Sequence, residues 1–364
     1  MKKILLIMVL TTLVFTLSAC GRDNTRLYHN PYEHVDWDNT TTILAALHNH
    51  TTNSDGDLMP HEVVDLFHGL GFGALAITDH EDDRLKHPPI TYPWDGFSDI
   101  NPDWEDRDPD ALGMLDIPGS EFSRVHHMTG LFTDLYLEAG YDVEAILAAI
   151  AEEELATVHF AHPGRYWNWL TDYEQGELYS PAWYIDFFER YDEETLLGIE
   201  VFSRNDFYEH DRYLWDILLT ELMPERTVWG LGVDDHHGSY AKWSFTQHPM
   251  LDTMDKDEFR QTLIDGAFFA VNIRQEGHEY PEITRISVDE DARTITIEAN
   301  NYDTIRWISG YDTVLKQSTV VGEGETFYYG DLDAPYVRAE VILADGSVFR
   351  RKVITQPFGL IQDD

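Results

Sequence analysis

The stretch LHNHTTNSDGDLMPHEVVDLFHGLGFGALAITDHEDD, residues 47–83, gathers histidine and aspartate at both ends of one helix-like segment. The apolar runs at 43–48 and 73–78 indicate buried strands, and residues 59–71 between them have apolar side chains at helical spacing. His48 and His50 are two residues apart, so they project to the same side of an extended chain. The stretch therefore predicts a strand–helix–strand unit with imidazoles at its strand ends.

The same alternation of short apolar runs and helical segments continues to about residue 240. This pattern predicts an α/β fold with parallel strands and helical crossovers, either a barrel or a doubly wound sheet. In such folds the polar residues directly after each strand meet at one rim, where the functional site is built.

Polar residues that suit divalent transition metals recur at these predicted strand ends. Imidazole and carboxylate groups together, without thiolate, are ligands suited to Zn²⁺, Mn²⁺ or Fe²⁺. A single histidine at a strand end is more often a hydrogen-bonded structural residue. Nine histidine, aspartate and glutamate residues on one rim instead predict a metal site. The nine are His48, His50, Asp55, His80, Glu121, His127, His162, Asp234 and His236.

Six motifs in this part of the chain resemble those of the PHP (polymerase and histidinol phosphatase) metallohydrolase family, in the same order. They read LHNHTTNSDG, AITDH, GSEFS, HHMTGLF, AHPGR and GVDDHH. The resemblance covers about residues 43–240. It implies a distorted seven-stranded (β/α) barrel with two or three metals at its rim.

The resemblance also implies which residues hold each metal. His48, His50 and Asp234 would hold the first metal, and Glu121 would bridge the first and third; the further sets are Asp55, His80 and His236 for the second metal, and His127 and His162 for the third. Within GVDDHH the family pattern selects Asp234 and His236, with Asp235 and His237 as neighbours. Asp79, beside His80, is interpreted as an orienting acid rather than a ligand.

Clustered metals favour hydrolysis by an activated water, and we expect an enzyme that acts on a small phosphate ester. The alternatives are an ester or carbamate hydrolase, or a surface protein that binds metal or ligand without turnover. Arg124, Arg165 and Arg204 follow rim motifs and either clamp a substrate anion or pair with carboxylates. Arg165 is our candidate for a catalytic contact, and Glu200 is open between a structural role and a substrate contact.

Charge excludes one class of partner. The 364 residues contain 67 Asp and Glu against 25 Lys and Arg, a formal net charge of -42. Such a surface repels nucleic acid, so no nucleic-acid partner is expected.

The N-terminus has the pattern of an exported lipoprotein. Lys2 and Lys3 precede an apolar run, and residues 17–20, Leu-Ser-Ala-Cys, resemble the bacterial lipobox. We therefore expect a signal peptide over 1–19, lipidation of Cys20, and a protein anchored to a membrane of a bacterial cell envelope. Residues 20–42 are predicted to be a tether.

Two folded domains are expected after this tether. Residues 43–280 would form the metallohydrolase domain, including a long rim loop at 84–112. Period-two alternation and an Asp345-Gly346 turn predict a β-sandwich domain over 281–364.

The lipidation site generates a first prediction. Replacing the only cysteine, Cys20→Ser, removes the sulfur to which the lipid would be attached, and should leave the protein as unprocessed precursor or outside the membrane fraction. Cell fractionation with labelled fatty acid measures both outcomes. Unchanged lipid labelling of the variant would contradict the assignment.

Overall fold

The computed structural model describes residues 24–363, except 83, 88–93, 139, 168–178, 205, 239–242, 275–276 and 345–349. The predicted signal peptide, Cys20 and the start of the predicted tether lie outside the described residues. Within the described part of the chain, no helix has the length and apolar character needed to cross a membrane.

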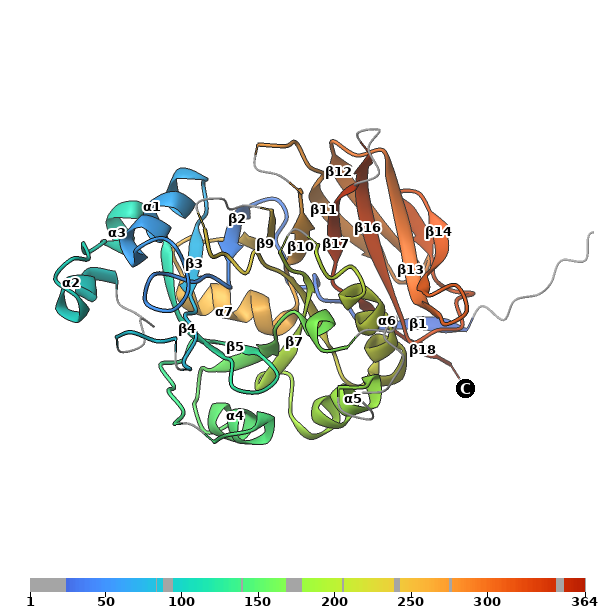
Figure 1. Cartoon of the computed structure of the whole chain (residues 1–364). Helices are drawn as coiled ribbons and strands as arrows, with labels where there is room; N and C mark the ends of the chain where they lie inside the picture. Colours follow the sequence, from blue (N-terminus) through green and yellow to red (C-terminus); the bar gives the residue numbers. More distant parts are fainter. Residues whose placement is uncertain are drawn as a thin grey trace, which may run out of the picture.

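The chain forms short helices and eighteen strands in the described residues (Figure 1). The helices are α1 Pro60–Gly69, α2 Phe97–Ile100, α3 Pro109–Leu112, α4 Val143–Ile150, α5 Pro181–Arg190, α6 Asp211–Leu222 and α7 Lys256–Asp265, with single 3₁₀ turns η1 Trp94–Gly96 and η2 Pro163–Arg165. The strands of the first part are β1 Thr25–His29, β2 Thr41–Ala46, β3 Ala74–Ile77, β4 Leu115–Phe122, β5 Met128–Leu131, β6 Thr157–Phe160, β7 Leu196–Phe202, β8 Trp229–Gly232, β9 Ser244–Met250 and β10 Phe269–Asn272. The remaining strands are β11 Glu282–Asp289, β12 Thr294–Asn300, β13 Thr304–Asp312, β14 Gln317–Glu323, β15 Thr326–Tyr328, β16 Tyr336–Ala344, β17 Arg350–Thr355 and β18 Phe358–Gln362.

The predicted α/β class is confirmed in its coarse form: a large mixed sheet carries helices on its faces (Figure 1). Strands β2 to β8 lie in sequence order, and β2–β3, β3–β4, β6–β7 and β7–β8 are parallel pairs. Strand β5 differs from the prediction because it is antiparallel to both β4 and β6. Only residues 123–127 connect β4 to β5, which is too short for a crossover between parallel strands.

The segment that follows β8 lies beside the segment that follows β2. Asn49 and His236 form an isolated parallel bridge, in which the His50 N–H donates to the His236 carbonyl at 2.8 Å. The strand ends of β2 to β8 are thereby brought round toward one another. This places the predicted rim motifs around a common centre.

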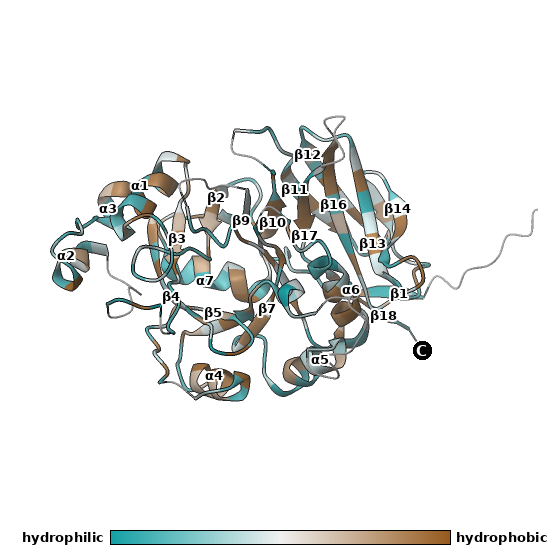
Figure 2. Cartoon of the chain, in the orientation of Figure 1, coloured by the Kyte–Doolittle hydropathy of each residue, from teal (hydrophilic) through white to brown (hydrophobic). Residues whose placement is uncertain are grey.

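Apolar strands and amphipathic helices account for this arrangement. All four residues of β3 and all seven of β7 are buried, as expected for strands covered on both faces (Figure 2). Asp142 caps the N-terminus of α4, since its side chain accepts the Ala145 N–H, and the helix buries Val143, Ile146 and Leu147 in the core.

The C-terminal strands form two sheets with one shared apolar core. Strands β11, β12 and β15 make a separate sheet, whereas β13, β14, β16, β17 and β18 extend the large sheet through the antiparallel β10–β17 pair. Ile295 and Ile297 of β12 belong to the same core as Trp307 of β13 and Val341 of β16. The C-terminal strands therefore continue directly from the sheet that carries the rim.

Part of the predicted tether is folded, which corrects that expectation. Strand β1 pairs antiparallel with β18, and Tyr32 is buried with its hydroxyl donating to the Phe268 carbonyl at 3.1 Å. Residues 25–42 look polar in sequence, but strand pairing and one buried ring hold them to the fold. In the predicted rim loop, the described residues form η1, α2 and α3.

A fully buried ion pair joins α6 to strand β16. Arg338 of β16 contacts Asp216 of α6 with an Nη2–Oδ2 distance of 2.7 Å, and its guanidinium lies 5.0 Å from the Trp215 ring centroid. The Tyr336 hydroxyl also donates to Asp216, at 2.9 Å. Burial would lower the pKa of Arg338, but the Asp216 carboxylate outweighs it and raises that pKa.

Removing Asp216 should destabilise the protein strongly. In Asp216→Ala the buried Arg338 guanidinium loses the carboxylate that binds its Nε and Nη2 and keeps only Glu340, 3.2 Å from Nη1. Breaking a buried ion pair typically costs about 3–5 kcal/mol. The midpoint of urea unfolding measures the loss. Glu144→Ala is the control, since it breaks the exposed Glu144–Arg190 pair and should cost at most about 1 kcal/mol. Equal midpoints for the two variants would contradict a structural role for the buried pair.

Candidate metal centre

The rim motifs converge on the carboxylate of Glu121. Five imidazoles have a ring nitrogen within 3.5 Å of a Glu121 carboxylate oxygen. The distances are 2.6 Å for His80, 2.7 Å for His127, 3.2 Å for His162, 3.4 Å for His48 and 3.5 Å for His50. Glu121 is fully buried, so these contacts are shielded from bulk water.

The ligand-type atoms divide into overlapping groups. In each group the potential ligand atoms all lie within 4.8 Å of one another. The groups are His50, Asp55, His80 and His237; His48, His50 and Asp235; His48, Glu121 and His162; and His80, Glu121 and His127. Seven of the nine predicted ligands are thus brought together.

Asp234 and His236 are the two predicted ligands that the structure places elsewhere. The Asp234 carboxylate accepts the backbone N–H groups of Trp243 at 2.9 Å and Ser244 at 2.8 Å. The His236 ring is buried edge-on against Phe67, with the ring centroids 5.3 Å apart. Both side chains therefore stabilise the fold beside the cluster.

Asp235 and His237 take the two places instead. Asp235 Oδ1 lies 3.2 Å from His50 Nε2 and 3.6 Å from His48 Nε2, and His237 Nε2 lies 3.3 Å from Asp55 Oδ1. Asp235 has a positive φ of 46°, which turns the chain just after β8. Asp235 and His237 have the same Asp-x-His spacing as the predicted pair and lie one residue later in the chain.

The buried carboxylate of Asp79 holds residues 51–54 in place. Asp79 accepts the Thr51 N–H and hydroxyl, both at 2.7 Å, and the Ser54 hydroxyl at 2.6 Å, so it fixes the loop that leads to Asp55. Burial raises the pKa of Asp79 despite these hydrogen bonds. Its position agrees with an orienting role for Asp79.

Glu200 positions two histidines, His48 and His162. Its Oε1 lies 2.6 Å from His48 Nδ1, and its Oε2 accepts the His162 N–H at 2.7 Å. Burial would raise the pKa of Glu200, but His48, His159 and His162 outweigh it and lower the pKa to about 2. A carboxylate that holds the far nitrogen of an imidazole fixes the orientation of the ring.

Helix α6 clamps the loop that carries His162. The Gly164 N–H donates to the Asp211 carboxylate, and the His210 ring donates to the Gly164 carbonyl at 2.9 Å. A Cβ at position 164 would meet Tyr208 Cβ at 2.7 Å, so only glycine fits. His162 itself has a φ of 28°, and the clamp stabilises this uncommon conformation.

The three predicted rim arginines have different surroundings. Arg124 pairs with the buried Glu81, with Nε and Oε2 3.5 Å apart. Arg204 is 46% exposed and its Nε lies 2.9 Å from Asp235 Oδ2, directly beside the cluster. Arg165 is exposed, and its guanidinium lies 5.8 Å from the Tyr166 ring centroid.

Buried ring nitrogens without a well-aligned hydrogen bond indicate that the cluster fits metal ions. His48 Nε2 and both ring nitrogens of His50 are fully buried and make no well-aligned hydrogen bond to any part of the chain that the structure describes. A buried polar atom left in this state is costly, whereas a divalent metal accepts an imidazole lone pair as a ligand. The donor set is wholly imidazole and carboxylate, which suits transition metals.

The charges of the cluster influence one another. Burial lowers the pKa of His50 well below its usual range, and His80 and His237 add to the effect. Burial would also lower the pKa of His80, but Glu121 and Asp55 raise it to about 9. The pKa of Glu121 is held well below its usual range, since His80, His48 and His127 together outweigh its burial.

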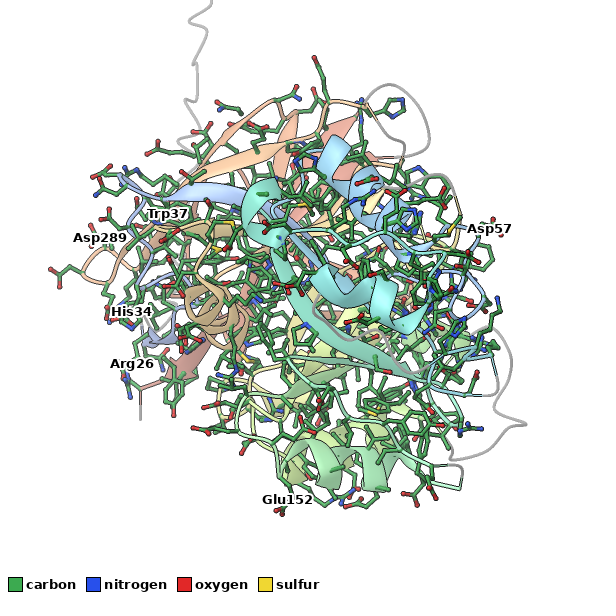
Figure 3. The ribbon with its side chains drawn as sticks, turned by 90° about the vertical axis from the view of Figure 1, so that its left-hand side faces the viewer. Arg26, His34, Trp37, Asp57, Glu152 and Asp289 are labelled. Atoms are coloured by element: carbon green, nitrogen blue, oxygen red, sulfur yellow. The ribbon has the colours of Figure 1, made fainter. Side chains whose placement is uncertain are left out.

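The cluster lies on the side of the molecule away from the N-terminal strand. Asp57, whose N–H donates to the His237 carbonyl at 2.7 Å, marks the loop beside it. Figure 3 shows Asp57 at one edge of the molecule, with Arg26 and His34 at the opposite edge.

No protein-family model matches the chain, and no curated protein matches it in sequence. Several solved structures are similar to it, among them the following two. One is a two-domain protein containing a predicted PHP-like metal-dependent phosphoesterase from Bacteroides vulgatus, with a TM-score of 0.47 and 18% identity, over 90% of this chain and 98% of that chain. The other is a candidate metal-dependent phosphoesterase from Bifidobacterium adolescentis, with a TM-score of 0.37 and 16% identity, over 61% of this chain and 96% of that chain.

Each TM-score is below 0.5 and each identity is below 20%, and we therefore infer the function from the side chains of the cluster.

The choice between the two Asp-x-His pairs generates a prediction. His237→Ala should lower the metal content of the reconstituted protein by about one equivalent, because it removes one donor of the group around Asp55 and His80. His236→Ala should keep the metal content, since that ring packs on Phe67. Elemental analysis after desalting measures both variants. Metal loss in the His236 variant alone would restore the assignment predicted from sequence.

Proposed function

We propose that this protein is a metal-dependent hydrolase that cleaves phosphate esters. The observation that carries the proposal is the set of five imidazoles around the buried Glu121 carboxylate, with Asp55 and Asp235 at its sides. A ligand set of this size has places for two to three divalent transition metals, with Zn, Mn and Fe the candidates.

The overlapping groups divide the ligands among these metals. His48, His50 and Asp235 would hold one metal, and Asp55, His80 and His237 a second. Glu121, His127 and His162 would hold a third, since ring nitrogens of His127 and His162 lie 2.7 and 3.2 Å from Glu121 Oε1. The same oxygen lies 3.4 Å from His48 Nε2 of the first set. When bound, these metals supply a nucleophilic water near neutral pH and positive charge against the oxygens of the ester.

The chain's own residues supply orientation and anion binding. Glu200 fixes the His48 ring, and Asp79 fixes the loop before Asp55. Arg204 Nε contacts Asp235, and its Nη2 lies 3.4 Å from His237 Nδ1. A guanidinium has five N–H donors, so the half-exposed Arg204 has donors left for a phosphate oxygen. In the overall reaction, water oxygen bonds to phosphorus, the P–O bond to the alcohol breaks, and the alcohol leaves with a proton.

We also propose the finer assignment of the fold. The Asn49–His236 bridge supports a distorted (β/α)₇ barrel formed by β2 to β8. The shared core of the two C-terminal sheets supports a β-sandwich domain that begins near residue 281.

Arg165 tests the substrate class. If the substrate carries phosphate, Arg165→Ala should lower kcat/KM on 4-nitrophenyl phosphate by roughly 10- to 200-fold, because a charge-assisted hydrogen bond is worth about 1.5–3 kcal/mol. The metal content should not change, and inorganic phosphate should inhibit the parent protein more than the variant. Arg26→Ala is the control, since Arg26 pairs with Asp363 at the opposite edge of the molecule (Figure 3).

The alternative reactions predict different results. Equal losses on 4-nitrophenyl phosphate and 4-nitrophenyl acetate would count against an anion contact and favour a carboxyl ester or carbamate hydrolase. A fully metal-loaded protein that turns over none of these substrates would favour binding without catalysis.

A further inference from the structure

Among the ligand-type residues of the cluster, Asp55 and His237 are the most exposed. Most members of the cluster are almost completely buried, whereas the side chains of Asp55 and His237 are 35% and 22% exposed. Arg84 pairs with Asp55 at 3.1 Å. The exposed part of the cluster therefore has a polar edge, next to the second predicted metal.

The edge next to His162 is aromatic. The ring centroids of Tyr166 and Tyr208 each lie 6.3 Å from that of His162, and Tyr166 lies 5.9 Å from His127. Phe207 meets Tyr208 edge-on at 4.9 Å and is 73% exposed. We call Tyr166, Phe207 and Tyr208 the aromatic edge.

Contacts with the fold hold this edge in place. The Tyr166 hydroxyl accepts the His127 N–H at 3.2 Å, and its ring lies 4.1 Å from the buried His126 ring. On the other side, Asp206 pairs with both Arg212 and Arg274 directly before Phe207. A binding surface fixed before the ligand arrives loses little entropy on binding.

Positive charge lies beside the same rings. The Arg165 guanidinium lies 5.8 Å from the Tyr166 ring centroid, and Arg204 forms an ion pair with Asp235. Burial raises the pKa of Tyr208, and the nearby Arg204 and Arg165 oppose this shift. An anionic group bound by the metals and arginines would therefore place its substituent against the aromatic edge.

We infer that the site selects phosphate esters whose alcohol carries a planar ring, bound against Tyr166, Phe207 and Tyr208. This inference rests on the proposed function and adds the class of alcohol. Stacked or edge-to-face contacts with one or two rings correspond to about a 5- to 50-fold gain in affinity. An aliphatic substituent of the same size buries similar area but lacks the aromatic geometry.

Binding of phosphonates tests the inference without turnover, because their P–C bond is not hydrolysed. On the manganese-loaded protein, calorimetry should give affinities in the order 2-phenylethylphosphonate, 2-cyclohexylethylphosphonate, ethylphosphonate. The first should bind about 5- to 50-fold more tightly than the last. A phenyl compound that binds no better than the cyclohexyl compound would overturn the selection of planar rings.

Variants then locate the ring. Phe207→Ala and Tyr208→Leu should each lower the phenyl-to-ethyl affinity ratio by at least about 3-fold. Tyr28→Ala is the control: Tyr28 is 54% exposed but lies in β1, which pairs with β18 in the C-terminal part of the sheet, and the ratio should not change. An unchanged ratio in both edge variants would overturn the assignment to these residues.

Turnover of 2-phenylethyl phosphate and ethyl phosphate separates this inference from the proposed function. The two alcohols leave with similar acidity, so a difference in kcat/KM reports binding of the ring. Ring-dependent phosphonate binding without any turnover would overturn the phosphoesterase and leave the aromatic edge as a binding surface. Turnover without ring dependence would overturn the aromatic edge alone.

Discussion

The convergence of five imidazoles on the buried carboxylate of Glu121 constrains much of the fold around it. His48, His80 and His162 follow parallel strands and reach the centre from strand ends. His127 instead precedes β5, so it reaches the same centre only because β5 runs antiparallel to its neighbours. A parallel β5 would carry this imidazole to the opposite end of the sheet, and the reversed strand is therefore a requirement of the metal centre.

A second layer of buried acids keeps these imidazoles in place. Glu200 orients His48 and holds the backbone of His162, Asp79 secures the loop before Asp55, and Asp211 clamps Gly164. Each carboxylate receives hydrogen bonds from backbone or side-chain groups nearby, which offset part of the cost of its burial. The strongly acidic composition thus contributes to the interior as well as to the surface.

Sequence patterns predicted the α/β class and most of the cluster, because strand-end positions follow from local spacing. The family pattern selected Asp234 with His236, but Asp235 with His237 has the same spacing, so spacing alone does not separate the two pairs. That choice depends on the bridge to Asn49 and on the positive φ of Asp235, which arise from contacts with a distant strand. The folding of residues 25–42 was missed for the same reason, because the partner of β1 lies near the other end of the chain.

The antiparallel β10–β17 pair has a practical consequence for anyone who divides this chain. A fragment that ends at residue 280 would retain β10 but lose its partner on one side, and the backbone groups of residues 269–272 would face solvent. The core shared by β12, β13 and β16 would be lost with it. Unpaired edges flanked by newly exposed apolar surface promote association between chains, so we expect the isolated first part to be poorly soluble on expression and the two parts to be produced best as one chain.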